Sequence, residues 1–238
     1  CNTGADLVVT PETTIPIFFG KEKELTQIVL EELKDCRSNI ILGVIDYIEE
    51  GKIRVYLNKA VHIKEGSVVA EYTKNILVPF GEYVPFRNIL TELIKNVSWP
   101  EDFKEGDKLI PFNINGYVSV TPICYEICFP FYMAQYKKEF IISLTNDMWF
   151  GKTIAPYLHL WAGSLRSVEN RSYIIRSANT GISAIIDPKG YQLLATKLFE
   201  PEIAVKTIQT VEPKDTVFQQ VPYLSLVLCF LILIRSLI

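Results

Sequence analysis

The sequence has little histidine and no patterned cysteine, and these shortages exclude several kinds of site. Its 238 residues hold only two histidines, His62 and His159, almost a hundred positions apart, which argues against a histidine-rich metal centre. No G-x-S-x-G elbow occurs, so a Ser/His/Asp hydrolase of that type is poorly supported. The five cysteines are too widely spaced for a disulfide framework or a zinc site, and most are expected to be small apolar core residues.

The chain also lacks any concentration of positive charge. It carries 24 basic and 27 acidic residues, a net charge of −3, with no basic block or stripe. Proteins that bind nucleic acid neutralise phosphates with such patches, so nucleic acid is not an expected partner. The length suits one α/β domain of about 200 residues with a single core.

The N-terminus has no initiator methionine, charged segment or apolar signal segment. Residue 1 is therefore expected to be a cut within a longer chain. A mature lipoprotein also begins with cysteine, but a flexible linker usually follows that cysteine. Here a strand is expected within about four residues, which favours the cut.

Apolar periodicity predicts alternating strands and helices. Residues 5–10, 21–35 and 40–48 form a predicted βαβ unit, and 54–63 with 67–72 form a predicted hairpin. Further strands are predicted at 117–123, 140–145 and 182–187, and further helices at 86–97 and 157–178.

The C-terminal segment is different in character. Residues 221–238 contain a single charge, Arg235, and are close to the length that crosses a hydrocarbon core of ~30 Å. We predict a transmembrane helix there, with a buried or swapped terminal helix as the alternative. The position of Arg235 places the C-terminus in the cytoplasm and the domain on the other side.

Three polar motifs follow the ends of predicted strands: "PET" at 11–13, "CYE" at 124–126 and "NDMWFG" at 146–151. Each alone could be an ordinary turn. Ligand sites in α/β proteins form at the carboxyl ends of strands, so three motifs in such positions predict one shared site.

Cys124 is the candidate nucleophile of that site. A strand-to-helix elbow would surround its sulfur with backbone N–H groups that favour a thiolate and stabilise an oxyanion. The alternative is a small buried thiol, the commoner role of free cysteine. Glu12, held between Pro11 and the "TTIP" turn, favours the catalytic interpretation because a thiol without a nearby histidine needs another general base.

The motifs "PETTIP", "YTKNILVPFGEYVPF", "PICYEICFP", "NDMWFG" and "RSVENRSYIIRSANTGISAIID" resemble the carbon-nitrogen hydrolase (nitrilase) superfamily. Within it they resemble the apolipoprotein N-acyltransferase family most. The resemblance implies an α/β fold, a nitrilase-like α-β-β-α sandwich, over residues 1–212, followed by the transmembrane helix. It also implies that the chain is N-terminally truncated, without the family's membrane bundle and the first strand and helix of the domain.

The resemblance assigns three catalytic roles. Glu12 corresponds to the general base, Lys74 to the lysine that stabilises the oxyanion, and Cys124 to the nucleophile. Without the resemblance, Lys74 would be interpreted as a solvated lysine at a strand end.

Four supporting residues follow from the same resemblance. Glu82 corresponds to a second essential glutamate, Tyr125 and Glu126 lie beside the nucleophile, and Trp149 belongs to a loop over the acyl site. Taken alone, Glu82 would be an ordinary turn carboxylate.

The implied activity moves a fatty acyl chain from a phospholipid to the N-terminal cysteine amine of a diacylglyceryl-modified lipoprotein, through a cysteine thioester. The implied location is the bacterial inner membrane, with the catalytic domain on the periplasmic face, and no cofactor or metal is needed. Two alternatives are a soluble amidase of the same superfamily and an inactive membrane-anchored remnant.

Overall fold

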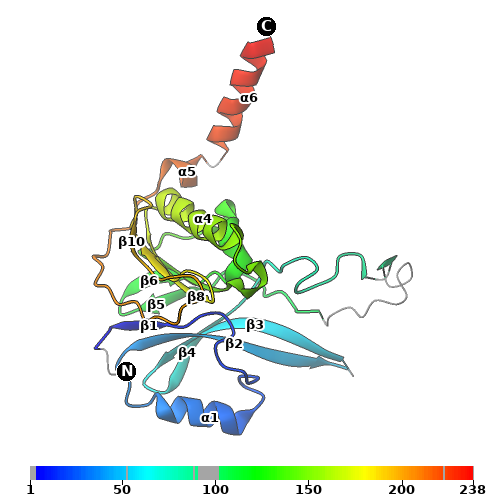
Figure 1. Cartoon of the computed structure of the whole chain (residues 1–238), viewed down its shortest axis with the longest axis vertical. Coiled ribbons are helices and arrows are strands. Elements are labelled where there is room, and N and C mark those ends of the chain that lie inside the picture. The colour runs from blue at the N-terminus through cyan, green and yellow to red at the C-terminus, as the bar shows by residue number, and fades with distance from the viewer. Residues whose placement is uncertain (1–3, 52, 88, 91–101, 222, 238) are drawn as a thin grey trace.

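The computed structural model describes residues 4–51, 53–87, 89–90, 102–221 and 223–237. Two β-sheets lie face to face at its centre (Figure 1). One sheet has the order β1-β2-β3-β4, and the other has the order β10-β9-β8-β7-β6-β5.

The strands of the first sheet are β1 (Leu7–Val9), β2 (Asn39–Glu50), β3 (Ile53–Lys64) and β4 (Ser67–Thr73). Those of the second are β5 (Pro111–Ile114), β6 (Tyr117–Val120), β7 (Phe140–Asn146), β8 (Tyr173–Asn179), β9 (Ala184–Ile186) and β10 (Gln192–Ala195). The helices are α1 (Lys23–Glu32), η1 (Cys124–Cys128), α3 (Pro130–Met133), η2 (Asp147–Phe150), α4 (Ala155–Asn170), α5 (Val217–Gln220) and α6 (Leu224–Leu237).

The predicted βαβ unit and hairpin are both confirmed. Strand β1 pairs in parallel with β2, and α1 connects them. Strands β3 and β4 pair antiparallel, with the turn at residues 65 and 66 where the sequence reads Glu-Gly. Gly66 has φ +69°, a left-handed conformation that glycine adopts without steric cost.

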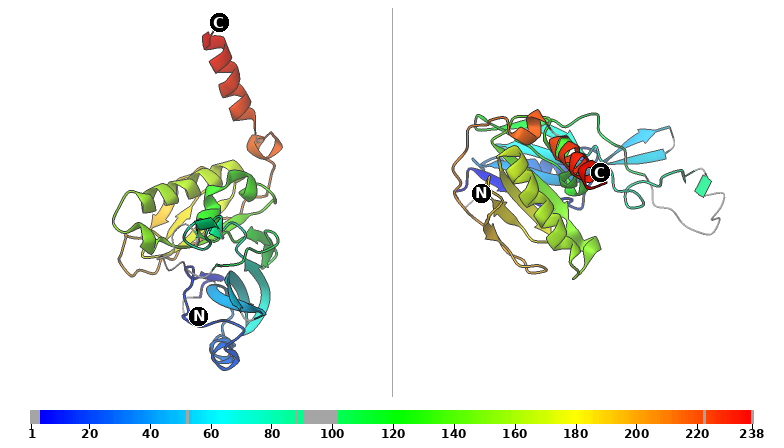
Figure 2. Two further views of the ribbon diagram at one scale, coloured as in Figure 1. Left: turned by 90° about the vertical axis from the view of Figure 1, so that its right-hand side faces the viewer. Right: turned by 90° about the horizontal axis from the view of Figure 1, so that it is seen from above.

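Two apolar cores give the fold its layers. One contains Ile41 and Ala60 of the first sheet with Ile141 and Ile142 of the second, and it extends to Leu160 of α4. The other lies between the first sheet and α1. Helix α1 covers the outer face of the first sheet and α4 covers the outer face of the second, so the order of layers is α-β-β-α, as expected (Figures 1 and 2).

The long helix predicted at 157–178 is wrong in its second half. Helix α4 ends at Asn170, and β8 begins at Tyr173. Arg171 has a left-handed backbone, φ 51° and ψ 39°, and its N–H closes the helix on the carbonyls of Ser167 and Val168. The apolar residues after it pair with β7 along the whole strand. The helical spacing of the charged residues continues past Asn170 in the sequence, but the left-handed backbone of Arg171 ends the helix there.

The C-terminal helix is shorter than predicted. Helix α6 has 14 residues, against the 18 predicted at 221–238. At 1.5 Å per residue it is about 21 Å long, below the ~30 Å of a hydrocarbon core. Within the described ranges, no helix combines the length and apolar character needed to cross a membrane. Helix α6 projects away from the sheets in Figure 1 and in the left view of Figure 2.

Two other expectations have separate outcomes. Most of the helix predicted at 86–97 lies outside the described residues. Most of the five cysteines were expected to be small apolar core residues; Cys36 is buried, but it is disulfide-bonded. Cys124, Cys128 and Cys229 are free.

Gly43 of β2 is the point where the first sheet supports the loop that carries Glu12. A Cβ atom on Gly43 would lie 2.2 Å from the carbonyl oxygen of Pro11 and 2.8 Å from the Cα of Glu12. The carbonyl of Gly43 accepts a hydrogen bond from the Thr14 N–H at 2.8 Å. No side chain larger than hydrogen fits without moving this loop.

We therefore expect Gly43→Ala to lower the free energy of unfolding by about 2 kcal/mol, as overpacking does, and the melting temperature by about 4–8 °C. The matched control is Gly163→Ala in α4, where the new Cβ would meet Ile186 at 3.7 Å and Ile174 at 3.9 Å, ordinary contact distances. Thermal unfolding followed by circular dichroism measures both. Equal melting temperatures for the two variants would contradict this assignment.

Candidate active site

Glu12 lies in the loop after β1 and connects the two sheets. Its side chain is buried. Oε1 accepts a hydrogen bond from Asn58 Nδ2 of β3 at 2.6 Å, and Oε2 accepts one from the backbone N–H of Asn146 at the end of β7 at 2.7 Å. Partners from opposite sheets therefore hold the carboxylate in one orientation.

Lys74 follows β4 directly and is almost fully buried, with 1% of its surface exposed. Its Nζ lies 2.8 Å from Oε1 of Glu82 and 3.6 Å from Oε1 of Glu12. Burial lowers the pKa of Lys74, but the negative charges of Glu12 and Glu82 and the hydrogen bond to Glu82 outweigh it, so the pKa is raised. The side chain is an ammonium ion at neutral pH.

Glu82 completes this cluster from the loop after Lys74. Besides Lys74, it accepts a hydrogen bond from Asn58 Nδ2 at 3.1 Å and one from the backbone N–H of Val78 at 2.8 Å. Asn58 therefore donates to both carboxylates that flank the ammonium.

Cys124 begins the short helix η1 and has a left-handed backbone with φ 52°. Burial raises the pKa of its thiol to about 12; the charges of Glu12 and Asp147 also raise it, while Lys74 and a hydrogen bond with Thr145 oppose the shift. The expectation that this position favours a thiolate is therefore wrong for the resting protein. One turn of helix does not offset the loss of solvent, and the thiol keeps its proton.

Glu126 holds the segment after Lys74 against the segment that carries Cys124. Its carboxylate accepts hydrogen bonds from the Tyr72 hydroxyl at 2.6 Å and from the N–H groups of Asn75 and Ile76 at 2.7 and 3.0 Å. It also accepts one from the N–H of Ile123 at 2.7 Å. The side chain is fully buried. Burial raises the pKa of its carboxyl group, and the four hydrogen bonds oppose that rise without cancelling it.

The two aromatic supporting residues lie at the surface. Tyr125 is half-exposed and meets the ring of Phe129 edge-on. Trp149 of η2 is 84% exposed. The structure thus gathers Glu12, Lys74, Glu82, Cys124 and Glu126 in the interior, and leaves Tyr125 and Trp149 outside that buried network.

Sequence reasoning missed several residues of the site. Asn58 lies inside an alternating strand and carries no motif that could have indicated it. His159 was set aside because no motif surrounds it, yet its Nε2 lies 3.1 Å from the backbone oxygen of Cys124. Asp147, one residue after Asn146 in "NDMWFG", lies 2.9 Å from the other ring nitrogen of that histidine. Of these three residues, only Asp147 belongs to a motif that could have indicated it.

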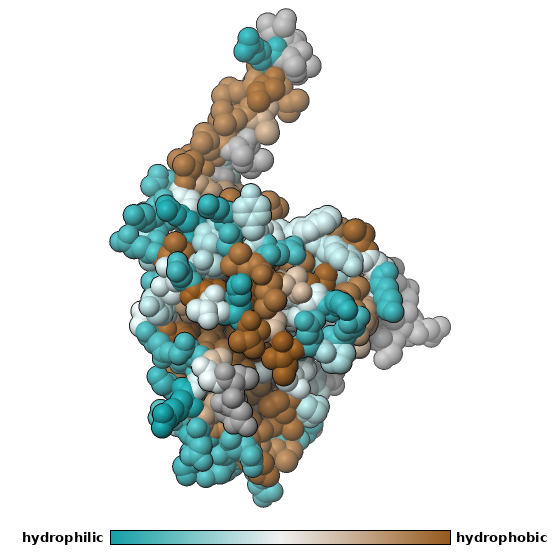
Figure 3. All heavy atoms as spheres, turned by 60° about the vertical axis from the view of Figure 1, so that its left-hand side comes forward, coloured by the Kyte–Doolittle hydropathy of each residue, from teal (hydrophilic) through white to brown (hydrophobic). Residues whose placement is uncertain are grey.

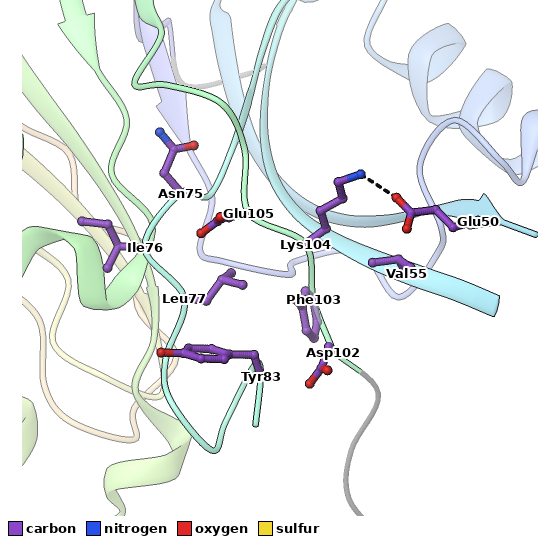
Figure 4. Close-up of a pocket in the computed structure, with 10 residues that line it drawn as sticks. All are labelled: Glu50, Val55, Asn75, Ile76, Leu77, Tyr83, Asp102, Phe103, Lys104 and Glu105. Atoms are coloured by element: carbon purple, nitrogen blue, oxygen red, sulfur yellow. Dashed lines mark hydrogen bonds and ion pairs between the residues drawn. The ribbon is translucent and has the colours of Figure 1, made fainter. Parts of the chain in front are cut away.

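A cavity of about 690 Å³ lies beside the buried cluster. Asn75, Ile76 and Leu77, which follow Lys74, line one side, and Phe103 to Glu105 line the other (Figure 4). Neither Glu12, Lys74 nor Cys124 lines it. The cavity is therefore a neighbour of the cluster rather than the space above the thiol. Among the described residues, no group of His, Cys, Asp and Glu side chains could hold a metal ion.

Known proteins match the chain in sequence and in fold. The carbon-nitrogen hydrolase family model matches residues 1–214. An apolipoprotein N-acyltransferase of Aquifex aeolicus is 38% identical over 186 residues, 78% of this chain and 41% of the relative. One of Geobacter metallireducens is 32% identical over 209 residues, 85% of this chain and 40% of the relative. The chain thus spans about two fifths of the length of these relatives.

Solved structures share the fold at low sequence identity. A carbon-nitrogen hydrolase from Helicobacter pylori G27 has a TM-score of 0.61 at 16% identity, covering 83% of this chain and 75% of that one. The NitN amidase from Nesterenkonia sp. AN1 has a TM-score of 0.59 at 18% identity, covering 83% and 77%.

The chain belongs to the carbon-nitrogen hydrolase family. Within that family, the curated relatives that it matches at 30–38% identity are apolipoprotein N-acyltransferases.

The raised pKa of Cys124 predicts an unusual pH dependence for its alkylation. Because the thiolate is the reactive form, the rate of modification by iodoacetamide should rise about tenfold per pH unit from pH 7 to pH 10 without levelling off. Free cysteine in the same tube, with a pKa near 8.5, should level off above pH ~9. Mass spectrometry of the Cys124 peptide measures the rate. A plateau below pH 8 would show a thiolate in the resting protein.

Proposed function

We propose that this protein is an acyltransferase that moves a fatty acyl chain from a phospholipid to the N-terminal amine of a lipoprotein, through a thioester on Cys124. The observation that supports this most is the convergence of a carboxylate, an ammonium and a thiol in one buried network. Cys124 interacts electrostatically with both Glu12 and Lys74, and Lys74 lies 3.6 Å from Glu12. The apolipoprotein N-acyltransferases among its relatives support the choice of substrates.

In the first half-reaction, Glu12 accepts the proton of the Cys124 thiol as the sulfur attacks the ester carbonyl of the phospholipid. A resting thiol with a raised pKa needs such a base, because proton removal must accompany attack. The Lys74 ammonium and backbone N–H groups at the start of η1 stabilise the tetrahedral oxyanion. When the C–O bond breaks, the leaving lysophospholipid oxygen takes the proton from Glu12, and the thioester remains.

In the second half-reaction, the α-amine of the diacylglyceryl-modified cysteine attacks the thioester. Glu12 accepts a proton from the attacking nitrogen and returns it to the sulfur of Cys124 as the C–S bond breaks. The products are an amide and the regenerated thiol, so the enzyme ends as it began. Glu82 keeps the Lys74 ammonium in place throughout.

We propose that the protein works at the extracytoplasmic face of the bacterial inner membrane. Helix α6 supports this, since Phe230, Leu231 and Ile232 are 63%, 55% and 67% exposed and the helix presents a continuous apolar column in Figure 3. Both proposed substrates, a phospholipid and a diacylglyceryl-modified protein, carry fatty acyl chains that suit such a surface. The disulfide at Cys36 is typical of proteins outside the reducing cytosol.

The test replaces the nucleophile and a neighbouring cysteine separately. Cys124→Ser should lower acyl transfer at least about 10³-fold, because the thioester cannot form. Cys128→Ser, four residues further on at an exposed free cysteine, should leave transfer unchanged. The assay uses the intact chain in membranes that lack their own enzyme, a phospholipid with a labelled acyl chain, and a peptide with a diacylglyceryl-modified N-terminal cysteine.

Two results would overturn the proposal. Full transfer by Cys124→Ser would reject the nucleophile. Release of labelled fatty acid instead of labelled peptide amide would indicate an enzyme that uses water as acceptor.

A further inference from the structure

The backbone of Cys124 is strained in a way that requires support. Its φ of 52° lies in the left-handed region, which residues with a side chain rarely occupy. Such a conformation persists only where the surroundings hold it. Because Cβ and the carbonyl group leave the same Cα atom, the backbone conformation sets the direction in which the Cys124 side chain starts, and rotation about the Cα–Cβ bond then places the sulfur. A group that holds the carbonyl therefore helps to place the sulfur, together with any contact to the thiol itself.

His159 is the side chain that binds this carbonyl. Its Nε2 lies 3.1 Å from the backbone oxygen of Cys124. A carbonyl oxygen can only accept, so Nε2 carries the proton and donates it. The ring is buried within α4, and the ring of Phe150 packs against it edge-on at 5.8 Å.

Asp147 and Arg176 fix the other side of the ring. Nδ1 of His159 lies 2.9 Å from Oδ1 of Asp147 and 3.2 Å from Nη2 of Arg176. Arg176 in turn donates to Oδ2 of Asp147 at 2.6 Å, and its Nε donates to the Ile182 carbonyl at 3.1 Å. The three side chains are buried and come from η2, α4 and β8.

Asp147 also reaches Cys124 by a second route. Its Oδ1 accepts a hydrogen bond from Thr145 Oγ1 at 2.9 Å, and the same Thr145 hydroxyl bonds to the Cys124 thiol. One carboxylate thus connects to the carbonyl of Cys124 through His159 and to its sulfur through Thr145. A network placed only to stabilise α4 would not need to end on both groups of one residue.

We propose that His159 is a positioning residue for Cys124, and that Asp147 and Arg176 hold its ring in the orientation that donates to the Cys124 carbonyl. The inference rests on the proposed role of Cys124 as nucleophile. His159 does not touch the substrate. It keeps the sulfur at the distance and angle from which attack occurs, and a misplacement of about 1 Å can cost about 10²-fold in rate.

The sequence offers a matched control, since His62 is also buried and also uses Nε2, facing Asn39 Oδ1 at 3.0 Å. The variants are His159→Ala, His159→Gln and His62→Ala in the intact chain. Three quantities are measured: thioester formation on Cys124 from phospholipid, alkylation of Cys124 by iodoacetamide at pH 9, and the melting temperature.

His159→Ala should slow both reactions of Cys124 by about 10²-fold and leave the KM for phospholipid within about threefold. His159→Gln, whose amide can donate to the same carbonyl, should carry out both reactions at least tenfold faster than His159→Ala. His62→Ala should lower the melting temperature and leave both reactions of Cys124 unchanged. A purely structural role for His159 predicts instead that His159→Ala and His62→Ala lose activity only in proportion to the fraction unfolded.

Asp147→Asn decides the matter if His159→Ala does not fold. It keeps the shape of the side chain but removes a charge next to the ring. Because that charge also raises the pKa of Cys124, its loss favours alkylation, so the readout for this variant is thioester formation, which a folded Asp147→Asn variant should slow at least tenfold. Wild-type alkylation in a folded His159→Ala variant, or wild-type thioester formation in a folded Asp147→Asn variant, would overturn the inference. Failure of the proposed function is distinguishable, because it would show as full acyl transfer by Cys124→Ser while these alkylation rates still differ.

Discussion

The site depends on a buried lysine held between two glutamates. The side chain of Lys74 has 1% of its surface exposed, and its Nζ lies 2.8 Å from Glu82 and 3.6 Å from Glu12. Taking such charges out of water costs several kcal/mol per ion, which only good geometry and further hydrogen bonds offset. Asn58 supplies those bonds to both carboxylates at once. A buried cluster of charges of this kind adds little net stability to the fold, so a catalytic role explains its presence better.

The fold brings these charges together from the ends of separate strands. Glu12 follows β1, Lys74 follows β4 and Cys124 lies just after β6. Contacts between the sheets then fix their spacing: the N–H of Asn146 in the second sheet binds Glu12 of the first, and Glu126 binds Asn75 and Ile76 beyond β4. The two sheets must therefore be packed before the site exists. This explains how Glu12, Lys74 and Cys124 meet in one network although 62 and 50 positions separate them along the chain.

The sequence predicted the fold where the apolar pattern was uninterrupted, and failed where backbone geometry decided. The βαβ unit, the hairpin and the strand at β7 follow from their apolar residues. The end of α4 did not, because only the left-handed conformation of Arg171 separates it from β8. A helix was predicted at 221–238, and the structure describes α6 over Leu224–Leu237; composition alone does not show where a helix begins.

The candidate site was predictable where motifs marked it and not elsewhere. Glu12, Lys74 and Cys124 were predicted from motifs; the structure places all three in one buried network, and their catalytic roles stay a proposal. The state of the thiol was not predictable, since desolvation of Cys124 depends on the packed interior and outweighs the short helix behind it. His159 was missed because its importance lies in one bond to a backbone oxygen, which no side-chain pattern reveals.

The most direct test measures thioester formation on Cys124 when the Lys74 ammonium is removed. Lys74→Met keeps a stem of similar length, and Lys74→Arg keeps the charge. Lys104→Met, at an exposed lysine paired with Glu50, is the control. Mass spectrometry of the Cys124 peptide after incubation with phospholipid should show the acyl adduct at the normal rate in the control, a reduced rate in Lys74→Arg, and a loss of at least about 10²-fold in Lys74→Met. A folded Lys74→Met variant that forms the thioester at the wild-type rate would contradict the central role of this buried charge.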